Sequence, residues 1–102
     1  MPTLTVIAQQ FQPHLHPQVI GRDVLLHDQP VSADSQPTYL LLHEPARIID
    51  LRAERVLRFA SRDHLDTYVT GGATSPADWA PLTDDEREAA QDVTQESQAR
   101  QT

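Results

Sequence analysis

Histidine is the residue type in this chain that offers the most chemistry. His14 and His16 flank one leucine between two prolines, and His43 ends an apolar run directly before Glu44. If the neighbouring apolar segments pair as an antiparallel hairpin, we expect His43 to lie close to His14 and His16. Imidazole nitrogens and a carboxylate suit zinc or another first-row metal. The candidate metal ligands are thus His14, His16, His43 and Glu44. The alternative is that they are solvated side chains at strand ends and turns, with no cofactor bound.

The C-terminal segment is the second candidate, because it concentrates much of the net charge of −7. Residues 1–82 carry nine acids and six arginines, so this part is nearly balanced. Further along, Arg87 stands among six acids: Asp84, Asp85, Glu86, Glu88, Asp92 and Glu96. A segment of this charge is suited to binding a partner protein with a basic surface. Nucleic acid is not expected as a partner, because its phosphates need cations.

Five arginines lie between Arg47 and Arg62, where guanidinium groups could bind phosphate or an acidic partner. Interleaved acids cancel most of their field, so we favour a solvated face whose charges pair internally. A further interpretation is that the acidic tail folds back on these arginines, and such contacts would be sensitive to salt.

No residue arrangement typical of an enzyme is present in the sequence. The chain has no cysteine, which excludes a disulfide scaffold, a thiolate metal site and a cysteine nucleophile. No serine lies in a Gly-x-Ser-x-Gly motif. Gly71-Gly72 has no lysine nearby to complete a phosphate-binding loop. We therefore expect no catalytic residues and a non-enzymatic protein.

The apolar runs are short. The first follows Met1 without a basic segment, so no signal peptide is expected, and no run reaches the 18 residues of a membrane span. We expect a cytoplasmic protein.

Three segments in the first half favour β-strands. Thr3–Phe11 is rich in β-branched residues and would place Leu4, Val6 and Ala8 on one face. Gln18–His27 reads as a second strand with a bulge at Gly21, and His27 with Asp28 as a surface pair at its end. Thr38–His43 is the third. The loop before it is too short for a helical crossover, so the second and third strands should pair antiparallel.

Residues 46–60 are ambiguous. They fit two short strands, Arg47–Leu51 and Arg55–Ala60, or part of one helix from Pro45 to about Val69. We favour the strands. Ser61 then caps a helix over Arg62–Val69 that ends at Gly71-Gly72.

Two further helix starts follow. Ser75-Pro76-Ala77-Asp78 predicts a single turn carrying Trp79. Thr83-Asp84-Asp85-Glu86 is a capping box. Val93 is the one large apolar residue of the helix that this box begins, so we expect fraying beyond about Asp92.

Phe59–Val69 resembles the strand, Ser-capped turn and helix of small α+β dimers, including the antibiotic-biosynthesis-monooxygenase type. The resemblance implies a cofactorless oxygenase-like dimer, with an apolar cavity lined by Tyr39, Phe59, Tyr68 or Trp79.

The sequence thus predicts an α+β protein with a four- or five-stranded, mostly antiparallel sheet and one main helix. Residues 1–82 would form the domain, and residues 83–102 an acidic helix or partly disordered tail. Open sheet edges favour a homodimer. The leading functional hypothesis is a non-enzymatic interaction or regulatory module that binds a partner protein. The alternatives are a metal- or small-ligand-binding protein and the oxygenase-like dimer.

Overall fold

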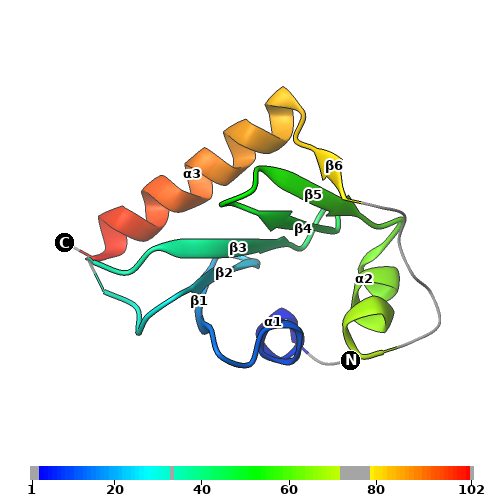
Figure 1. The fold of residues 1–102 in the computed structure, drawn as a ribbon, viewed down its shortest axis with the longest axis horizontal. Helices are drawn as coiled ribbons and strands as arrows, with labels where there is room; N and C mark the ends of the chain where they lie inside the picture. The colour runs from blue at the N-terminus through cyan, green and yellow to red at the C-terminus, as the bar shows by residue number, and fades with distance from the viewer. Residues whose placement is uncertain (1–2, 33, 72–78, 102) are drawn as a thin grey trace.

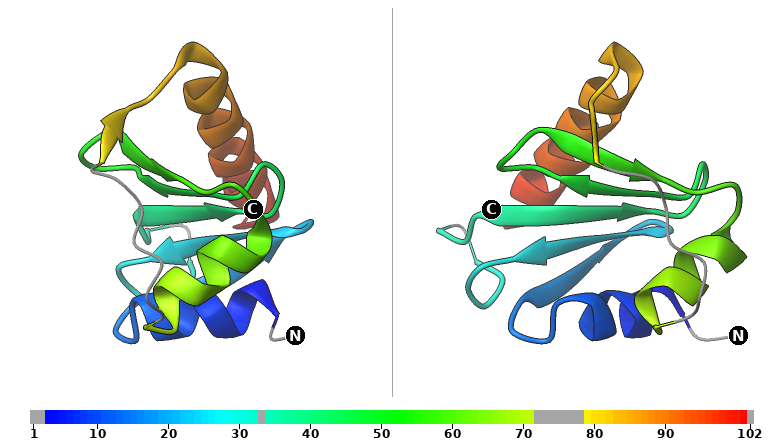
Figure 2. Two further views of the ribbon diagram at one scale, coloured as in Figure 1. Left: turned by 90° about the vertical axis from the view of Figure 1, so that its right-hand side faces the viewer. Right: turned by 45° about the vertical axis from the view of Figure 1, so that its right-hand side comes forward.

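The computed structural model describes residues 3–32, 34–71 and 79–101. In them, six strands form one antiparallel sheet in the order β1-β2-β3-β4-β5-β6. The strands are β1 (His16–Ile20), β2 (Asp23–His27), β3 (Pro37–Leu42), β4 (Arg47–Asp50), β5 (Arg55–Arg58) and β6 (Ala80–Pro81). The helices are α1 (Leu4–Phe11), α2 (Arg62–Val69) and α3 (Asp84–Gln101). Both α1 and α2 lie on one face of the sheet, and α3 crosses the other (Figure 1; Figure 2). None of these helices has the length and apolar character that crossing a membrane requires.

The expected fold class, α+β with a mostly antiparallel sheet, is confirmed. The details differ, because the sheet has six strands rather than four or five, and three helices pack on it rather than one. The helix α3 continues past Asp92, where fraying was expected, to Gln101. The proposed boundary after residue 82 stays a prediction.

The first segment, expected as a strand, is the helix α1. Thr3 caps it, since its side chain accepts a hydrogen bond from the Val6 amide at 3.3 Å. Leu4, Ile7 and Ala8 are buried. Their helical spacing places them on one stripe against the sheet, whereas Val6 is 42% exposed. Packing of this stripe outweighs the β-propensity of the branched residues.

The second expected strand is in fact the β1–β2 hairpin. Gly21 adopts φ 62, and Ile20 pairs with Asp23 across the two-residue turn Gly21-Arg22. Glycine supplies the positive φ that such turns need, so it reverses the chain instead of forming a bulge. This reversal has consequences for the histidines described below.

The elements from β3 to α2 agree with the sequence-based expectations, whereas Ala80–Pro81 form the strand β6 directly after Trp79, where a helical turn was expected. The β2–β3 pair is antiparallel, residues 47–50 and 55–58 form the β4–β5 hairpin, and Ser61 caps α2 over Arg62–Val69. Gly71 follows α2 with φ 90. The expected cap at Ser75 lies outside the described residues, as does Gly72.

The sheet separates two apolar cores of different composition. The core under α1 and α2 contains all the aromatic residues of the chain, namely Phe11, Tyr39, Phe59, Tyr68 and Trp79. The core under α3 is aliphatic, and α3 itself contributes Ala90 and Val93 to its buried residues. The C-terminal helix therefore buries little apolar surface of its own.

Candidate functional site

The helix α3 begins with the capping box that the sequence predicts. The Glu86 amide donates to Thr83 Oγ1 at 3.2 Å, and the Thr83 amide donates to Glu86 Oε1 at 2.8 Å. Asp84 and Asp85 occupy the first turn beside Glu86. Their negative charges interact favourably with the amino end of the helix dipole.

Glu86 also joins the start of α3 to the sheet. Its carboxylate accepts two hydrogen bonds from Arg58, at 2.9 and 2.8 Å, and lies 3.6 Å from Arg47 Nε. The bonds from Arg58 hold the pKa of Glu86 at about 2, against an ordinary 4.5. Arg87 adds an ion pair with Glu54 at 2.9 Å. The interpretation that the acidic segment folds back on the arginines is thus confirmed for Glu86.

The far end of α3 is joined to the edge strand β1. Ser97 is buried, and its Oγ donates to Gln18 Oε1 at 2.6 Å. Arg100 donates to the Val19 carbonyl at 3.2 Å. These contacts and Glu86 lie on the same side of α3 as Ala90 and Val93, because residues 86, 90, 93, 97 and 100 follow helical spacing. The helix is therefore held at its two ends by polar contacts and in the middle by two small apolar side chains.

Gln18 extends this attachment to a buried histidine. His27 Nε2 lies 2.8 Å from Gln18 Oε1, so this nitrogen carries the donated proton, and His27 Nδ1 lies 3.0 Å from Ser35 Oγ. His27 was expected in a surface pair with Asp28, but it is buried. Burial lowers the pKa of His27, and Asp28 partly opposes this effect. The neutral imidazole is thus the form favoured in the folded protein.

The other side of α3 carries the remaining acids of the predicted partner-binding set. They are Asp84, Asp85, Glu88, Asp92 and Glu96, and all of them are exposed. Glu96 lies 3.5 Å from Arg100 of the same helix. Within the described residues, the other four make no ion pair. One side of α3 is therefore a strip of solvated carboxylates, which we call the acidic face.

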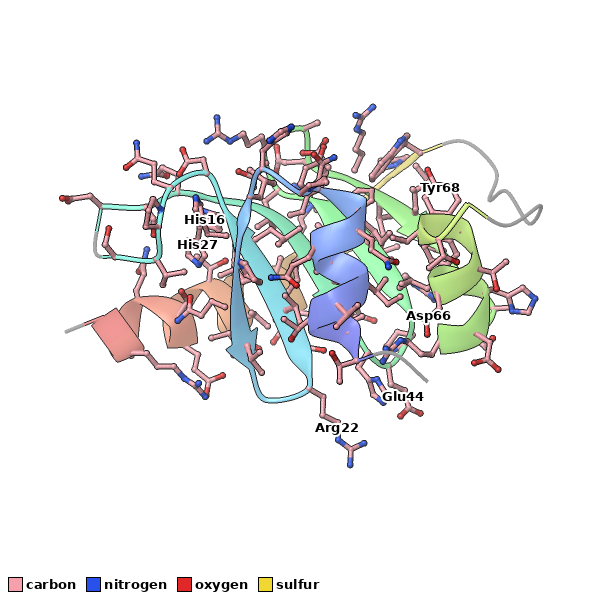
Figure 3. All side chains as sticks on the ribbon, turned by 90° about the horizontal axis from the view of Figure 1, so that it is seen from below. His16, Arg22, His27, Glu44, Asp66 and Tyr68 are labelled. Atoms are coloured by element: carbon pink, nitrogen blue, oxygen red, sulfur yellow. The ribbon has the colours of Figure 1, made fainter. Side chains whose placement is uncertain are left out.

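The structure does not bring the predicted metal ligands together. Because Gly21 turns the chain, His16 pairs with His27 at one end of the β1–β2 hairpin, whereas His43 donates its amide to Asp23 at the other end. Figure 3 shows His16 beside His27 and Glu44 near the opposite end, by Arg22. The antiparallel pairing was correct, but the single strand assumed in it was wrong. The described part of the chain holds no group of three or more potential metal ligands.

His43 has a different partner. Its Nδ1 lies 3.1 Å from Arg62 Nη1, and Arg62 Nε donates to Asp66 Oδ1 at 2.7 Å. A guanidinium only donates, so His43 Nδ1 accepts and its lone pair is used. The structure thus explains His43 as part of the contact between the β3–β4 turn and α2.

The aromatic residues that would line an oxygenase-like cavity belong to the core under α1 and α2. Phe59 and Tyr68 lie with ring centroids 5.5 Å apart, and Tyr39 packs edge-on against Phe11 at 5.1 Å. Trp79 packs against the same core and lies under the guanidinium of Arg55, at 4.5 Å. These side chains pack against one another and contribute to the stability of this face.

The open edge of β1 is poorly suited to pairing with a strand of a second copy. Because Ile20 and Asp23 flank the hairpin turn, Pro17 and Val19 direct their backbone groups to the open edge. Pro17 has no amide hydrogen, and the Val19 carbonyl already accepts from Arg100. The homodimer stays a prediction, and this edge is a poor route to it.

Sequence reasoning missed the hydrogen-bonded series Ser97–Gln18–His27–Ser35, because Ser97 lies 79 residues from Gln18 and the other members stand on different segments. A partial signal existed, since Ser97 continues the helical spacing of Ala90 and Val93. Comparison of this protein with protein-family models, with curated proteins and with solved structures finds no match in any of the three.

Proposed function

We propose that this protein is a non-enzymatic interaction module that binds a basic surface of a partner protein through the acidic face of α3. The observation that carries the proposal is the exposure of Asp84, Asp85, Glu88, Asp92 and Glu96 on a docked helix. Four of these carboxylates form no ion pair with any residue that the structure describes, although arginines of the sheet bind Glu86 nearby.

The acids of α3 have two different environments, and this difference supports the proposal. Glu86 binds Arg58 and Arg47, and so attaches the helix to the sheet. The other acids face water, where a row of like charges destabilises a helix slightly unless a cation approaches. A partner that supplies arginine or lysine would relieve this repulsion and would be steered toward α3 from a distance.

The test uses a fluorescein-labelled twelve-residue peptide of alternating arginine and alanine as the probe, with affinity measured by fluorescence anisotropy. The test variant, E88Q/D92N/E96Q, removes three charges from the acidic face. A matched control, D34N/E44Q/D63N, removes three charges from exposed sites elsewhere on the chain. We expect the test variant to weaken binding at least fivefold and the control to change it less than twofold.

Raising the salt concentration should weaken the wild-type complex and narrow this difference, because exposed charges are screened. Equal losses in the two variants would show that the probe senses only net charge. Absence of binding by the wild-type protein at low salt would also contradict the proposal.

A further inference from the structure

A groove of about 930 Å³ runs along α3 beside the acidic face, and Gln91 and Gln95 line it one helical turn from Glu88 and Asp92. Its helix wall runs from Arg87 to Gln98, and its other wall comes from Gln36, Pro37 and the β4–β5 turn. We propose that this groove binds a short extended peptide segment with acidic side chains. This site adjoins the acidic face without including its carboxylates, and it would select a partner of opposite charge.

The helix wall is built from amides. Gln91, Gln95 and Gln98 line the groove at helical spacing and are exposed. Within the described residues, their side chains make no hydrogen bond. Each carries both donors and an acceptor, which is what the main chain of an extended peptide requires. No acid of α3 is among the lining residues.

The opposite wall is held in place by a buried carboxylate. Asp50 Oδ1 accepts from the amides of Arg52 and Ala53, at 3.2 and 3.1 Å. Its Oδ2 accepts from Arg55 Nε at 3.1 Å. Glu54 completes the turn with φ 55. The turn is therefore fixed before any ligand arrives, which reduces the entropy lost on binding.

The charges in the groove favour an acidic occupant. Arg52 and Arg87 line it with side chains 59% and 46% exposed, and Glu54 is the acid among the lining residues. Each arginine uses one nitrogen in its ion pair, to Asp28 or to Glu54. The remaining N–H groups can take a carboxylate in a paired geometry. The lining thus has two arginines against one acid, although the chain has a net charge of −7.

The dimensions fit a short segment. The helix wall between Arg87 and Gln98 is about 16 Å long, which about five residues of extended chain would cover. Leu51, Leu82 and Ala90 supply apolar surface between the two walls. Such a segment could place acidic side chains at Arg52 and Arg87 and an aliphatic side chain between them.

The experiment pans a random twelve-residue phage-displayed peptide library on the immobilised full chain. An enriched sequence is then synthesised with a fluorescent label, and its affinity is measured by anisotropy. We expect acidic sequences with aliphatic residues to be enriched. Their affinity should fall at least tenfold in Q91E/Q95E, which adds charge to the helix wall but keeps good helix formers. It should fall similarly in R52Q/R87Q.

Two controls separate this site from the acidic face. The variant R22Q loses one charge at an exposed site, as R52Q alone does, and E88Q/D92N/E96Q alters only the acidic face; neither should weaken binding more than twofold. Enrichment of basic peptides that E88Q/D92N/E96Q abolishes would overturn the groove proposal and leave the proposed function standing. Absence of any enrichment over uncoated wells would overturn the groove proposal alone, since the arginine–alanine peptide tests the acidic face independently.

Discussion

One face of the sheet is closed by α1 and α2 through a core that holds every aromatic residue, whereas the other is closed by α3, which buries Ala90 and Val93. On the first face, apolar burial supplies the attachment. On the face covered by α3, polar contacts at Glu86, Ser97 and Arg100 supply much of the attachment. This difference indicates that α3 is held on the sheet more by polar and charged contacts than by buried apolar surface. Its outward side is therefore available to bind a partner.

The largest expected effect comes from truncating a core residue on the α1–α2 face. Leu65 is fully buried in α2, so Leu65→Ala should lower the free energy of unfolding by about 2–4 kcal/mol. Val93→Ala, at the centre of α3, should cost only about 1–1.5 kcal/mol. Urea unfolding followed by circular dichroism measures both. Equal losses would contradict the contrast between the faces.

The next effect concerns the charge of Glu86. Glu86→Gln keeps a capping side chain but removes the charged partner of Arg58, and should cost about 1 kcal/mol at neutral pH. The pKa of Glu86 is lowered to about 2 in the folded protein from 4.5, so its contribution is complete above pH 4.5 and lost as the pH falls toward 2.

Urea unfolding of the wild type and of Glu86→Gln at several pH values tests this pH dependence of the free energy of unfolding. The stability difference should shrink below pH 4.5, and the exposed Glu88→Gln should show little difference at any pH. A difference for Glu86→Gln that is the same at pH 3 and pH 6 would contradict the ion pair.

Removal of one hydroxyl tests the distal attachment of α3. Ser97→Ala should cost about 0.5–1 kcal/mol, because Gln18 loses one donor but keeps His27. Thr94→Ala is the matched control, since its hydroxyl donates to the Ala90 carbonyl of the same helix and, among the described residues, does not bond to the sheet. Amide hydrogen exchange should show faster opening of the last turns of α3 in Ser97→Ala alone. Unchanged exchange would argue against the Ser97–Gln18 contact.

The smallest expected effect is the titration of His27. Burial lowers the pKa of His27, so the folded state favours the neutral ring, and its contribution to stability is complete above about pH 6.5. That contribution is lost as the pH falls below this value. The unfolding free energy of the wild type should therefore fall more steeply between pH 7.5 and 5.5 than that of His27→Gln. Parallel curves would show that His27 does not titrate in this range.

Local signals in the sequence predicted much of the second half of the fold. Ser61 and the Thr83–Glu86 box are caps whose effect acts within one turn, so they fix where α2 and α3 begin. The first half was harder, since Thr3–Phe11 has β-branched residues that also satisfy helical spacing. Only packing against the sheet decides between the two patterns.

The candidate site, too, could be predicted from local sequence signals but not where it depends on tertiary structure. The acidic face was visible as a concentration of charge, and exposure on a regular helix follows from its spacing. The histidine cluster failed because one turn at Gly21 reverses the chain and moves His43 to the opposite end from His16. The groove could not be foreseen, because its walls come from residues 36–37, the β4–β5 turn and one side of α3, which the tertiary structure alone brings together.

The most direct measurement is a titration of the ¹⁵N-labelled chain with the arginine–alanine peptide, followed by amide chemical shifts. We predict saturable shifts at Asp84–Glu96 along the exposed side of α3, with little change in α1 and α2. Shifts centred on the α1–α2 face, or spread evenly over the whole chain, would contradict a partner-binding role for the acidic face.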